Sequence, residues 1–274
     1  MIKIENFEVV GMDHAIRGMR NPMNSWEKSD SIPKILDDTD CTDECYLGNH
    51  NRCAECHLTS MAGCILGEKD HELMMKLAVG GPVHAKYRRM ITVYLDITAP
   101  LYWWKEFDTY KVGTVANSCS TMHKIHEKVF TLEDFSCEHL MEWEEAKDAE
   151  CLVGDEIGCG DCLFSPYGVI NAVMIPLLNT CREKFLKAKE NGADGHTLKR
   201  YWWQMIQLLP SSYNQKRTIM LNYEVLTGIY ESRKNHKLDE WREFCKWIEE
   251  LPYSEIIIGT INPSEKVSGV REED

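Results

Sequence analysis

The stretch ITVYLDITAPLYWW, residues 91–104, decides the fold. Its first seven residues alternate apolar with polar side chains and are rich in β-branched types, which is typical of a half-buried strand. Pro100 lacks a backbone N–H donor and has a fixed φ angle, so it suits the start of the aromatic segment that follows. The sequence therefore predicts a strand at 91–97, then a turn and a helix.

The same period of two recurs at the N-terminus, where IKIENFEVV, residues 2–10, precedes Gly11 and predicts a second strand. Gly80-Gly81-Pro82 interrupts a helical pattern at 70–90 and predicts two short helices there. Periodicity predicts further helices at residues 132–149, 169–190, 198–209, 215–233 and 239–251. We expect an α+β fold, with a small mixed or antiparallel sheet packed by long helices.

Composition limits the domain organisation and the partners. The chain has 274 residues, of which 43% are hydrophobic, and 31 Lys and Arg against 44 Asp and Glu give a net charge of −13. This acidic balance disfavours a nucleic-acid or anionic-membrane binder, because such proteins need a basic surface. We expect one domain over residues 1–274 with a Cys-rich insertion at about 25–67, which lacks periodicity. Without an apolar run long enough for a membrane span or a signal peptide, we expect a cytoplasmic protein.

Twelve cysteines are unusual for a protein of a reducing compartment. Two Cys-x-x-Cys pairs, Cys53/Cys56 and Cys159/Cys162, have the local spacing of a tetrahedral zinc site. The pairs are about a hundred residues apart, which is outside the usual spacing of zinc fingers. Small buried hydrophobic residues, structural zinc and a redox or iron–sulfur role all remain open for these thiols.

Two segments carry candidate binding residues. Residues 103–123 interleave aromatic with hydrogen-bonding side chains, which suits a pocket that stacks on a planar ring and satisfies its polar edge. Residues 208–242 concentrate cations, which suits a phosphate group. A polar loop at a subunit interface and ordinary Lys and Arg placement at a helix C-terminus are the alternatives. The candidates are Tyr110, Lys111, Asn117, Ser120, His123, Lys216, Asn222 and Arg233.

In order and spacing, segments 9–26, 91–123 and 207–251 resemble the flavin-dependent thymidylate synthases, over somewhat more than a third of the chain. Asn117-x-x-Ser120 matches the Asn-x-x-Ser of the family motif Arg-His-Arg-x-x-Ser-x-Asn-x-x-Ser-x-Arg-Tyr. Thr109-Tyr110-Lys111 stands at the Arg-His-Arg position, and Met122-His123 stands at the closing Arg-Tyr. Leu209-Pro210, Asn222, Arg233 and Glu240 fall at further family positions.

The resemblance implies reductive methylation of dUMP or a related pyrimidine nucleotide. It also implies FAD as cofactor, NADPH and methylenetetrahydrofolate as co-substrates, and a homotetramer whose sites lie between subunits. Carried over position by position, it makes Ser120 and Arg233 the catalytic candidates and Tyr110, Lys111, Asn117 and Asn222 the cofactor-binding ones. Ser120, His123, Lys216 and Arg233 become the candidates for binding substrate.

Two positions that would contact the cofactor depart from the family pattern. Glu224 and Gly228 stand where the family has a flavin-contacting Arg and Asn. An acid beside a pyrophosphate is unfavourable unless another cation has moved in. The alternatives to an enzyme are therefore an inactive nucleotide-binding protein on the same scaffold and a zinc-stabilised structural protein.

Overall fold

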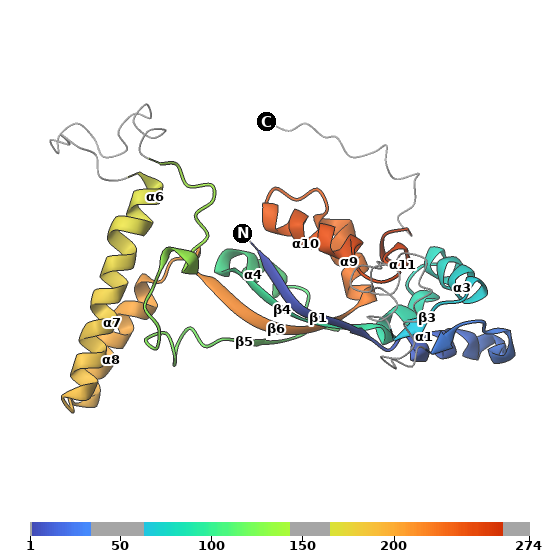
Figure 1. Ribbon diagram of the computed structural model, residues 1–274, viewed down its shortest axis with the longest axis horizontal. Helices are drawn as coiled ribbons and strands as arrows, with labels where there is room; N and C mark the ends of the chain where they lie inside the picture. The colour runs from blue at the N-terminus through green and yellow to red at the C-terminus, as the bar shows by residue number, and fades with distance from the viewer. Residues whose placement is uncertain (1, 34–62, 143–164, 260–274) are drawn as a thin grey trace, which may run out of the picture. The chain divides into compact units, whose positions relative to one another are not determined.

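The computed structural model describes residues 2–33, 63–142 and 165–259 (Figure 1). Its contacts divide the chain into two compact units, each described by itself below. The sheet unit comprises Ile2–Ile97, Asp108–Asn117 and Arg217–Asp274, and the hairpin unit comprises Thr98–Phe107 and Ser118–Lys216.

A four-stranded sheet has the order β1–β4–β6–β5. Its strands are β1 (Lys3–Val10), β4 (Thr92–Pro100), β5 (Val115–Ser118) and β6 (Asn214–Asn222). Val93, Leu95 and Ile97 of β4 are fully buried while the residues between them are more exposed, as the period of two predicts. Both strands predicted from alternation, β1 and β4, are confirmed.

A second, two-stranded sheet lies in the sheet unit. β2 (Ile32–Pro33) pairs antiparallel with β3 (Cys64–Ile65), and Pro33 is the partner of Cys64. These strands come from either end of the predicted Cys-rich insertion, and most of that insertion lies outside the described residues.

Helices of the sheet unit pack on one another. They are α1 (Met12–Arg20), η1 (Asn21–Met23), η2 (Trp26–Lys28), α3 (Glu68–Val79), η3 (Ala85–Met90), α9 (Tyr223–Arg233), α10 (Asp239–Glu249) and α11 (Glu255–Ile258). α9 packs on α10, α11 and η3, and α1 packs on η3 and α3. Gly11 sits at the start of α1 with a φ of 89°, and a Cβ there would lie 2.3 Å from the carbonyl oxygen of Met90. The two short helices expected around Gly80-Gly81-Pro82 are confirmed as α3 and η3.

The helix expected at 215–233 is wrong over its first half. Residues 214–222 form β6, and the chain passes into α9 at Tyr223 without a linker. Gln215, Ile219 and Leu221 are buried, so the side chains of this segment alternate between two faces instead of following a helical stripe. Asn222 and Arg233 therefore lie at opposite ends of α9, with Asn222 as its N-cap.

The hairpin unit is named for its two longest helices. They are α7 (Ile175–Glu190) and α8 (Gly195–Leu208), which pack side by side (Figure 1). Asp194 begins α8 by accepting hydrogen bonds from the backbone N–H groups of His196 and Thr197, at 2.8 and 3.0 Å. The predicted helices at 169–190 and 198–209 are confirmed, with a π-helical start at η5 (Val169–Met174) that follows the short α6 (Pro166–Gly168).

Aromatic side chains anchor the first part of this unit. α4 (Leu101–Phe107) buries Trp103, Trp104 and Phe107 completely, and the Trp104 indole N–H donates to the carbonyl of Gln215 at 3.0 Å. A second cluster of buried residues includes Phe130, Phe135, Leu178 and Met205.

The helix expected at 132–149 is wrong over the residues that the structure describes. A capping box at Thr131 and Asp134 starts only one 3-10 turn, η4 (Leu132–Asp134). Phe135 then has extended angles and forms an antiparallel bridge with Tyr213, so the next residues follow a neighbouring strand. The chain to residue 142 is not helical.

The predicted α+β class, a small sheet with many helices, is confirmed. Within the described ranges, every helix is too short or too polar to cross a bilayer. The expectation of a single domain stays a prediction.

Candidate functional site

Arg233, at the last turn of α9, is held by two aromatic residues. Its Nε–H donates to the Tyr110 hydroxyl at 2.9 Å, across 123 residues of sequence. Its guanidinium carbon lies 4.9 Å from the Trp241 ring centre and 5.7 Å from that of Tyr110. Cation–π contact and the hydrogen bond together fix the plane of the guanidinium. The structure thus brings together two candidates from separate segments, and adds Trp241 of α10.

Asn222 begins α9. Its side-chain oxygen accepts the backbone N–H of Val225 at 3.1 Å, which satisfies one of the unpaired donors of the first turn. The loop that carries Tyr110 approaches this cap closely at Gly113. With a φ of 81°, Gly113 has a conformation that L-residues rarely adopt, and a Cβ there would lie 2.9 Å from Nδ2 of Asn222.

Thr114 follows Gly113 and carries an unsatisfied group. Its hydroxyl oxygen is buried and has no hydrogen-bond partner within the described parts of the chain. A buried hydroxyl without a partner is costly, so this atom is suited to contact a bound molecule. The orphaned hydroxyl lies on the same loop as Tyr110 and Lys111.

The neighbours of Thr114 are open to solvent. Lys111 is exposed, as are all four residues of β5, including Asn117. Val112 and Val115 are 91% and 60% exposed, which is unusual for two valines on either side of a buried hydroxyl. The edge position of β5 in the sheet leaves this strand without a neighbour on one side among the described strands.

Charges beside the site are largely matched in pairs. Arg217 of β6 binds Asp108 through a 2.7 Å ion pair, with the guanidinium mostly buried. Glu224, in the first turn of α9, lies 3.7 Å from the buried guanidinium of Arg88. Arg88 also donates to the carbonyl of Ile256, which fixes its position. The Arg88 cation therefore lies beside Glu224, although the Oε2 atom of Glu224 forms no hydrogen bond within the described residues.

Three candidates lie in the hairpin unit. Ser120 is exposed, and its hydroxyl oxygen accepts the backbone N–H groups of Met122 and His123 at 3.3 and 2.8 Å. It therefore stabilises a local turn. The His123 side chain is exposed, and the carbonyl of Lys216 accepts the backbone N–H of Cys119 at 2.9 Å. The structure places Tyr110, Lys111, Asn117, Asn222 and Arg233 in the sheet unit and Ser120, His123 and Lys216 in the hairpin unit.

The four predicted metal ligands, Cys53, Cys56, Cys159 and Cys162, lie outside the described residues. Over residues 2–33, 63–142 and 165–259, no three His, Cys, Asp or Glu side chains gather as a metal site.

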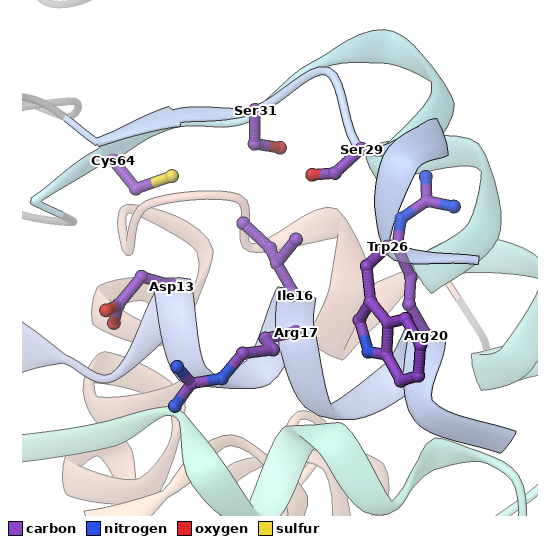
Figure 2. A pocket seen from close by; sticks show the side chains of 8 residues that line it. All are labelled: Asp13, Ile16, Arg17, Arg20, Trp26, Ser29, Ser31 and Cys64. Carbon is purple, nitrogen blue, oxygen red and sulfur yellow. The ribbon is translucent and has the colours of Figure 1, made fainter. Parts of the chain in front are cut away.

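A cavity that sequence reasoning missed lies beside α1 (Figure 2). It has a volume of about 220 Å³, and its walls include Ile16, Trp26 and the thiol of Cys64. Burial, aided by the charges of Asp13 and Asp70, raises the pKa of Cys64 to about 11. The thiol is therefore a neutral wall of the cavity at ordinary pH rather than a nucleophile.

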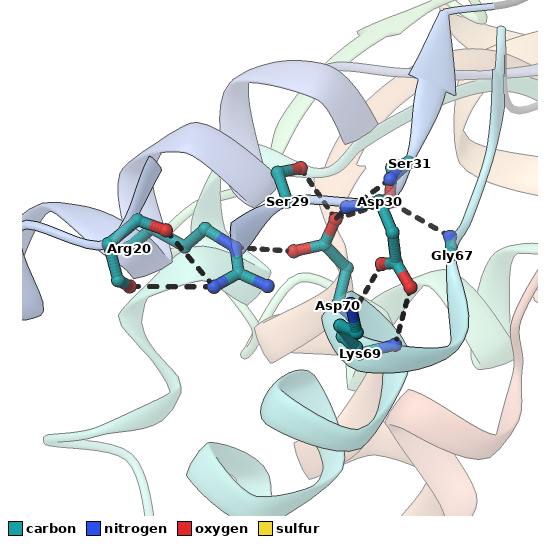
Figure 3. Close-up of polar contacts among 8 residues, drawn as sticks. Arg20, Ser29, Asp30, Ser31, Gly67, Lys69 and Asp70 are labelled. Carbon is teal, nitrogen blue, oxygen red and sulfur yellow. Dashed lines mark hydrogen bonds and ion pairs between the residues drawn. The ribbon is translucent and has the colours of Figure 1, made fainter. Parts of the chain in front are cut away.

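Arg20 borders this cavity and forms a buried ion pair with Asp70 at 2.6 Å (Figure 3). Hydroxyl groups of Ser29 and Ser31 also donate to Asp70, at 2.7 and 2.6 Å. Burial alone would raise the pKa of Asp70, but these hydrogen bonds and Arg20 lower it below its usual value. The sequence carries a signal for this pair, because Arg20 follows Met12 and Ile16 at steps of four on the buried face of α1.

Comparison with known proteins adds a fold relationship. No protein-family profile matches the sequence, and no curated protein is significantly similar to it. Among solved structures, the chain resembles the flavin-dependent thymidylate synthase ThyX from Helicobacter pylori complexed with FAD and dUMP. The TM-score is 0.52 and the identity 16%, over 95% of this chain and 99% of that one. A second structure of H. pylori ThyX with FAD and dUMP gives a TM-score of 0.51 at 16% identity, over 96% and 99%. At this identity the likeness shows the fold alone.

Proposed function

We propose that this chain is a ThyX-like enzyme that reductively methylates dUMP or a related pyrimidine nucleotide. The observation that carries the proposal is Arg233, whose guanidinium is fixed by Tyr110 and Trp241. Tyr110 lies in segment 91–123, and Arg233 and Trp241 lie in segment 207–251. Both segments belong to the part of the sequence that resembles the family. The fold likeness to ThyX structures holding FAD and dUMP supports the same conclusion.

The residues present fit a flavin nucleotide. Thr114 offers a buried hydroxyl that lacks a partner in the described chain, and Lys111 offers an exposed ammonium three residues earlier. A nucleotide cofactor carries hydroxyl, carbonyl and phosphate oxygens, which are the complements of these two groups. FAD, when bound, supplies the redox chemistry, with NADPH as reductant and methylenetetrahydrofolate as the source of the one-carbon unit.

Neither departure from the family pattern opposes this fit. The negative charge of Glu224 faces Arg88, so it is matched inside the protein before any ligand arrives. At Gly228, apart from its chain neighbours and the backbone of its own helix, no atom of the described chain lies within 4 Å of the position that a Cβ would take. The missing Asn therefore costs one contact but introduces no obstruction.

The protein's own groups position and stabilise the reactants. With Nε held by Tyr110, the terminal nitrogens of Arg233 present the fork that binds a phosphate or a pyrimidine edge. Ser120 and His123 act from their turn as donors to the substrate, and Lys216 adds a cation. Asn117 and Asn222 contact the cofactor. Because the plane of Arg233 is fixed in advance, less free energy is spent on ordering it when the nucleotide binds.

The active form that we propose is a homotetramer. Val112 and Val115, exposed on either side of Thr114, support the burial of this loop against another copy of the chain. Such burial would remove the side chains of Val112 and Val115 from water, which is favourable for apolar groups.

The test combines a spectrum with turnover. We expect the purified protein, reconstituted with FAD, to show the visible spectrum of a bound flavin and a thermal shift with dUMP. We expect tritium release from dUMP labelled at carbon 5 when NADPH and methylenetetrahydrofolate are supplied, and its loss in Arg233→Ala. Arg89→Ala, an exposed arginine of the same unit, is the matched control and should keep activity.

A colourless protein that takes up no FAD and shows no shift with dUMP contradicts the proposal. A shift with nucleotide in the absence of flavin binding and turnover would instead support a non-catalytic nucleotide-binding protein.

A further inference from the structure

A second hollow is also lined by Arg20, together with residues of η1, η2 and α3. It has a volume of about 360 Å³, within the range of small-molecule sites. We call it the lysine pocket. Its polar lining consists of Arg20, Ser25, Lys28, Lys69, Glu72 and Lys76.

Charge in the lysine pocket is unbalanced. Lys28, Lys69 and Lys76 face one carboxylate, Glu72, in a chain whose net charge is −13. The three lysine side chains are exposed, and none forms an ion pair with a carboxylate in the parts of the chain that the structure describes. Ammonium groups of like charge around one hollow repel each other, and a bound anion relieves that repulsion.

The base of the lysine pocket is rigid. The Arg20 side chain is only 5% exposed, and its Nε–H donates to Asp70, which is fully buried (Figure 3). A terminal nitrogen of Arg20 donates to the carbonyl of Ser25 at 3.2 Å. Since Asp70 matches the charge of Arg20, the positive charge of the lysines is in excess. The ion pair with Asp70 therefore fixes the position of Arg20 in the lining, while the three lysines attract an anion.

Helix geometry places two of the lysines on one face of α3, about 10 Å apart along its axis. Lys69 and Lys76 are seven residues apart on α3, which is nearly two turns and returns them to the same face. Lys28 comes from η2, on the opposite wall. Cations from two walls can surround a single charged group, whereas a row along one helix cannot.

We propose that the lysine pocket binds a small phosphorylated molecule through its phosphate or diphosphate group. A phosphate carries up to two negative charges and several acceptor oxygens, so it can engage three ammonium groups, whereas a single carboxylate would leave two of them unmatched. The acidic surface of the chain disfavours a nucleic-acid backbone. This site is separate from the Arg233 site, and the proposal does not depend on the proposed function.

The experiment is calorimetric titration of the full chain with inorganic pyrophosphate. We expect binding that weakens at high salt, and at least about a tenfold loss of affinity in the triple variant Lys28→Gln, Lys69→Gln, Lys76→Gln. The matched control replaces three exposed lysines elsewhere, Lys187→Gln, Lys237→Gln, Lys246→Gln, and should bind as the original chain does. Equal melting temperatures for the two triple variants exclude a folding effect.

Two further variants and a second ligand test the proposal in other ways. Glu72→Gln removes the one acid of the lysine pocket and should tighten pyrophosphate binding, which a purely structural role would not produce. The loss of affinity caused by the triple lysine substitution should be the same when Arg233→Ala is also present, which distinguishes this pocket from the proposed nucleotide site. Titration with a nucleoside diphosphate tells whether the ligand carries more than the diphosphate.

The proposal is overturned if pyrophosphate does not bind, or if both triple variants lose affinity equally. Tighter, lysine-dependent binding of single-stranded DNA than of either diphosphate would overturn it in favour of a nucleic-acid surface.

Discussion

Arg233 and Tyr110 meet through a 2.9 Å hydrogen bond although they belong to segments 123 residues apart. The contact joins the C-terminal end of α9 to the loop that precedes β5. The position of this loop and the orientation of the guanidinium are therefore set by one interaction, and its removal should affect both.

Tyr110→Phe tests this link. We expect the free energy of unfolding to fall by about 1 kcal/mol, because the hydroxyl that accepts from Arg233 is lost while the Trp241 contact remains. Urea unfolding measures it, with Tyr94→Phe as the control, since Tyr94 is 46% exposed on β4. The link is refuted if the two variants lose equal stability. The proposed nucleotide site further predicts weaker dUMP binding in Tyr110→Phe.

Gly113→Ala tests the approach of the loop to α9. At a φ of 81° an alanine costs about 1 kcal/mol of strain, and its Cβ would also press on Asn222. Gly81→Ala is the matched control, because Gly81 has a φ of 86° and, apart from its chain neighbours, no atom of the described chain within 4 Å of its Cβ position. We expect Gly113→Ala to be the more destabilising in denaturant titration, and equal losses would contradict the close approach.

Asn222 combines a capping role with a proposed cofactor contact, and two substitutions separate them. Asn222→Ala removes the acceptor for the Val225 N–H and should cost about 1 kcal/mol. Asn222→Asp keeps the cap, so stability should recover, but the added negative charge should weaken FAD binding. Flavin titration and urea unfolding measure the two effects. Full FAD affinity in Asn222→Asp would argue against the cofactor contact.

Asp70→Asn should be the most destabilising of these changes. It leaves the Arg20 cation buried without its partner, at a cost of about 3–5 kcal/mol. The folded state lowers the pKa of Asp70, so the carboxylate contributes stability above its unfolded pKa of about 3.9. That contribution is lost as the pH falls through the lower folded pKa.

The stability difference between the original chain and Asp70→Asn should therefore be full at pH 7 and shrink in acid, as measured by urea unfolding across pH. Asp239→Asn, which removes an exposed partner of Arg242, is the control and should change stability little. A difference that does not depend on pH would show that the Asp70 charge is not what stabilises the fold.

Thiol labelling checks the burial of the cysteines. Burial raises the pKa of Cys64 to about 11, and burial together with Glu249 raises that of Cys245 to about 12. Cys119 is exposed. We expect N-ethylmaleimide to modify Cys119 in the native protein, and the other two only after unfolding, as resolved by peptide mass spectrometry. Rapid native labelling of Cys64 would be inconsistent with the cavity wall described above.

The strands at β1 and β4 were predictable because their alternation is regular and their flanking Gly11 and Pro100 end them. β6 was not. Its sequence, NQKRTIMLN, is rich in residues with high helix propensity, and the helical pattern of α9 follows directly. Pairing within the sheet overrides that propensity, and no local signal marks the change at Asn222 except its capping side chain.

The candidate site was also only partly predictable, because its contacts depend on the fold as well as on the local sequence. Tyr110 and Arg233 were recognised from residue type and family resemblance, but their contact depends on how the two segments fold together. Trp241 and Arg88 were missed because a buried aromatic or a buried cation has no distinctive local sequence. Arg88 is recognisable only as the partner of Glu224.

The pairing of Pro33 with Cys64 has a consequence for how this chain tolerates changes of length. The chain leaves the small sheet at Pro33 and re-enters it directly opposite at Cys64, with thirty residues of sequence in between. Because Pro33 and Cys64 are already paired, we expect a two-residue hairpin turn in place of residues 34–63 to keep the register of β2 and β3. By contrast, β6 passes into α9 without a linker, and one inserted residue there would rotate the helix by about 100°. Natural variation in length should therefore gather between Pro33 and Cys64 and be absent from the strand–helix junction.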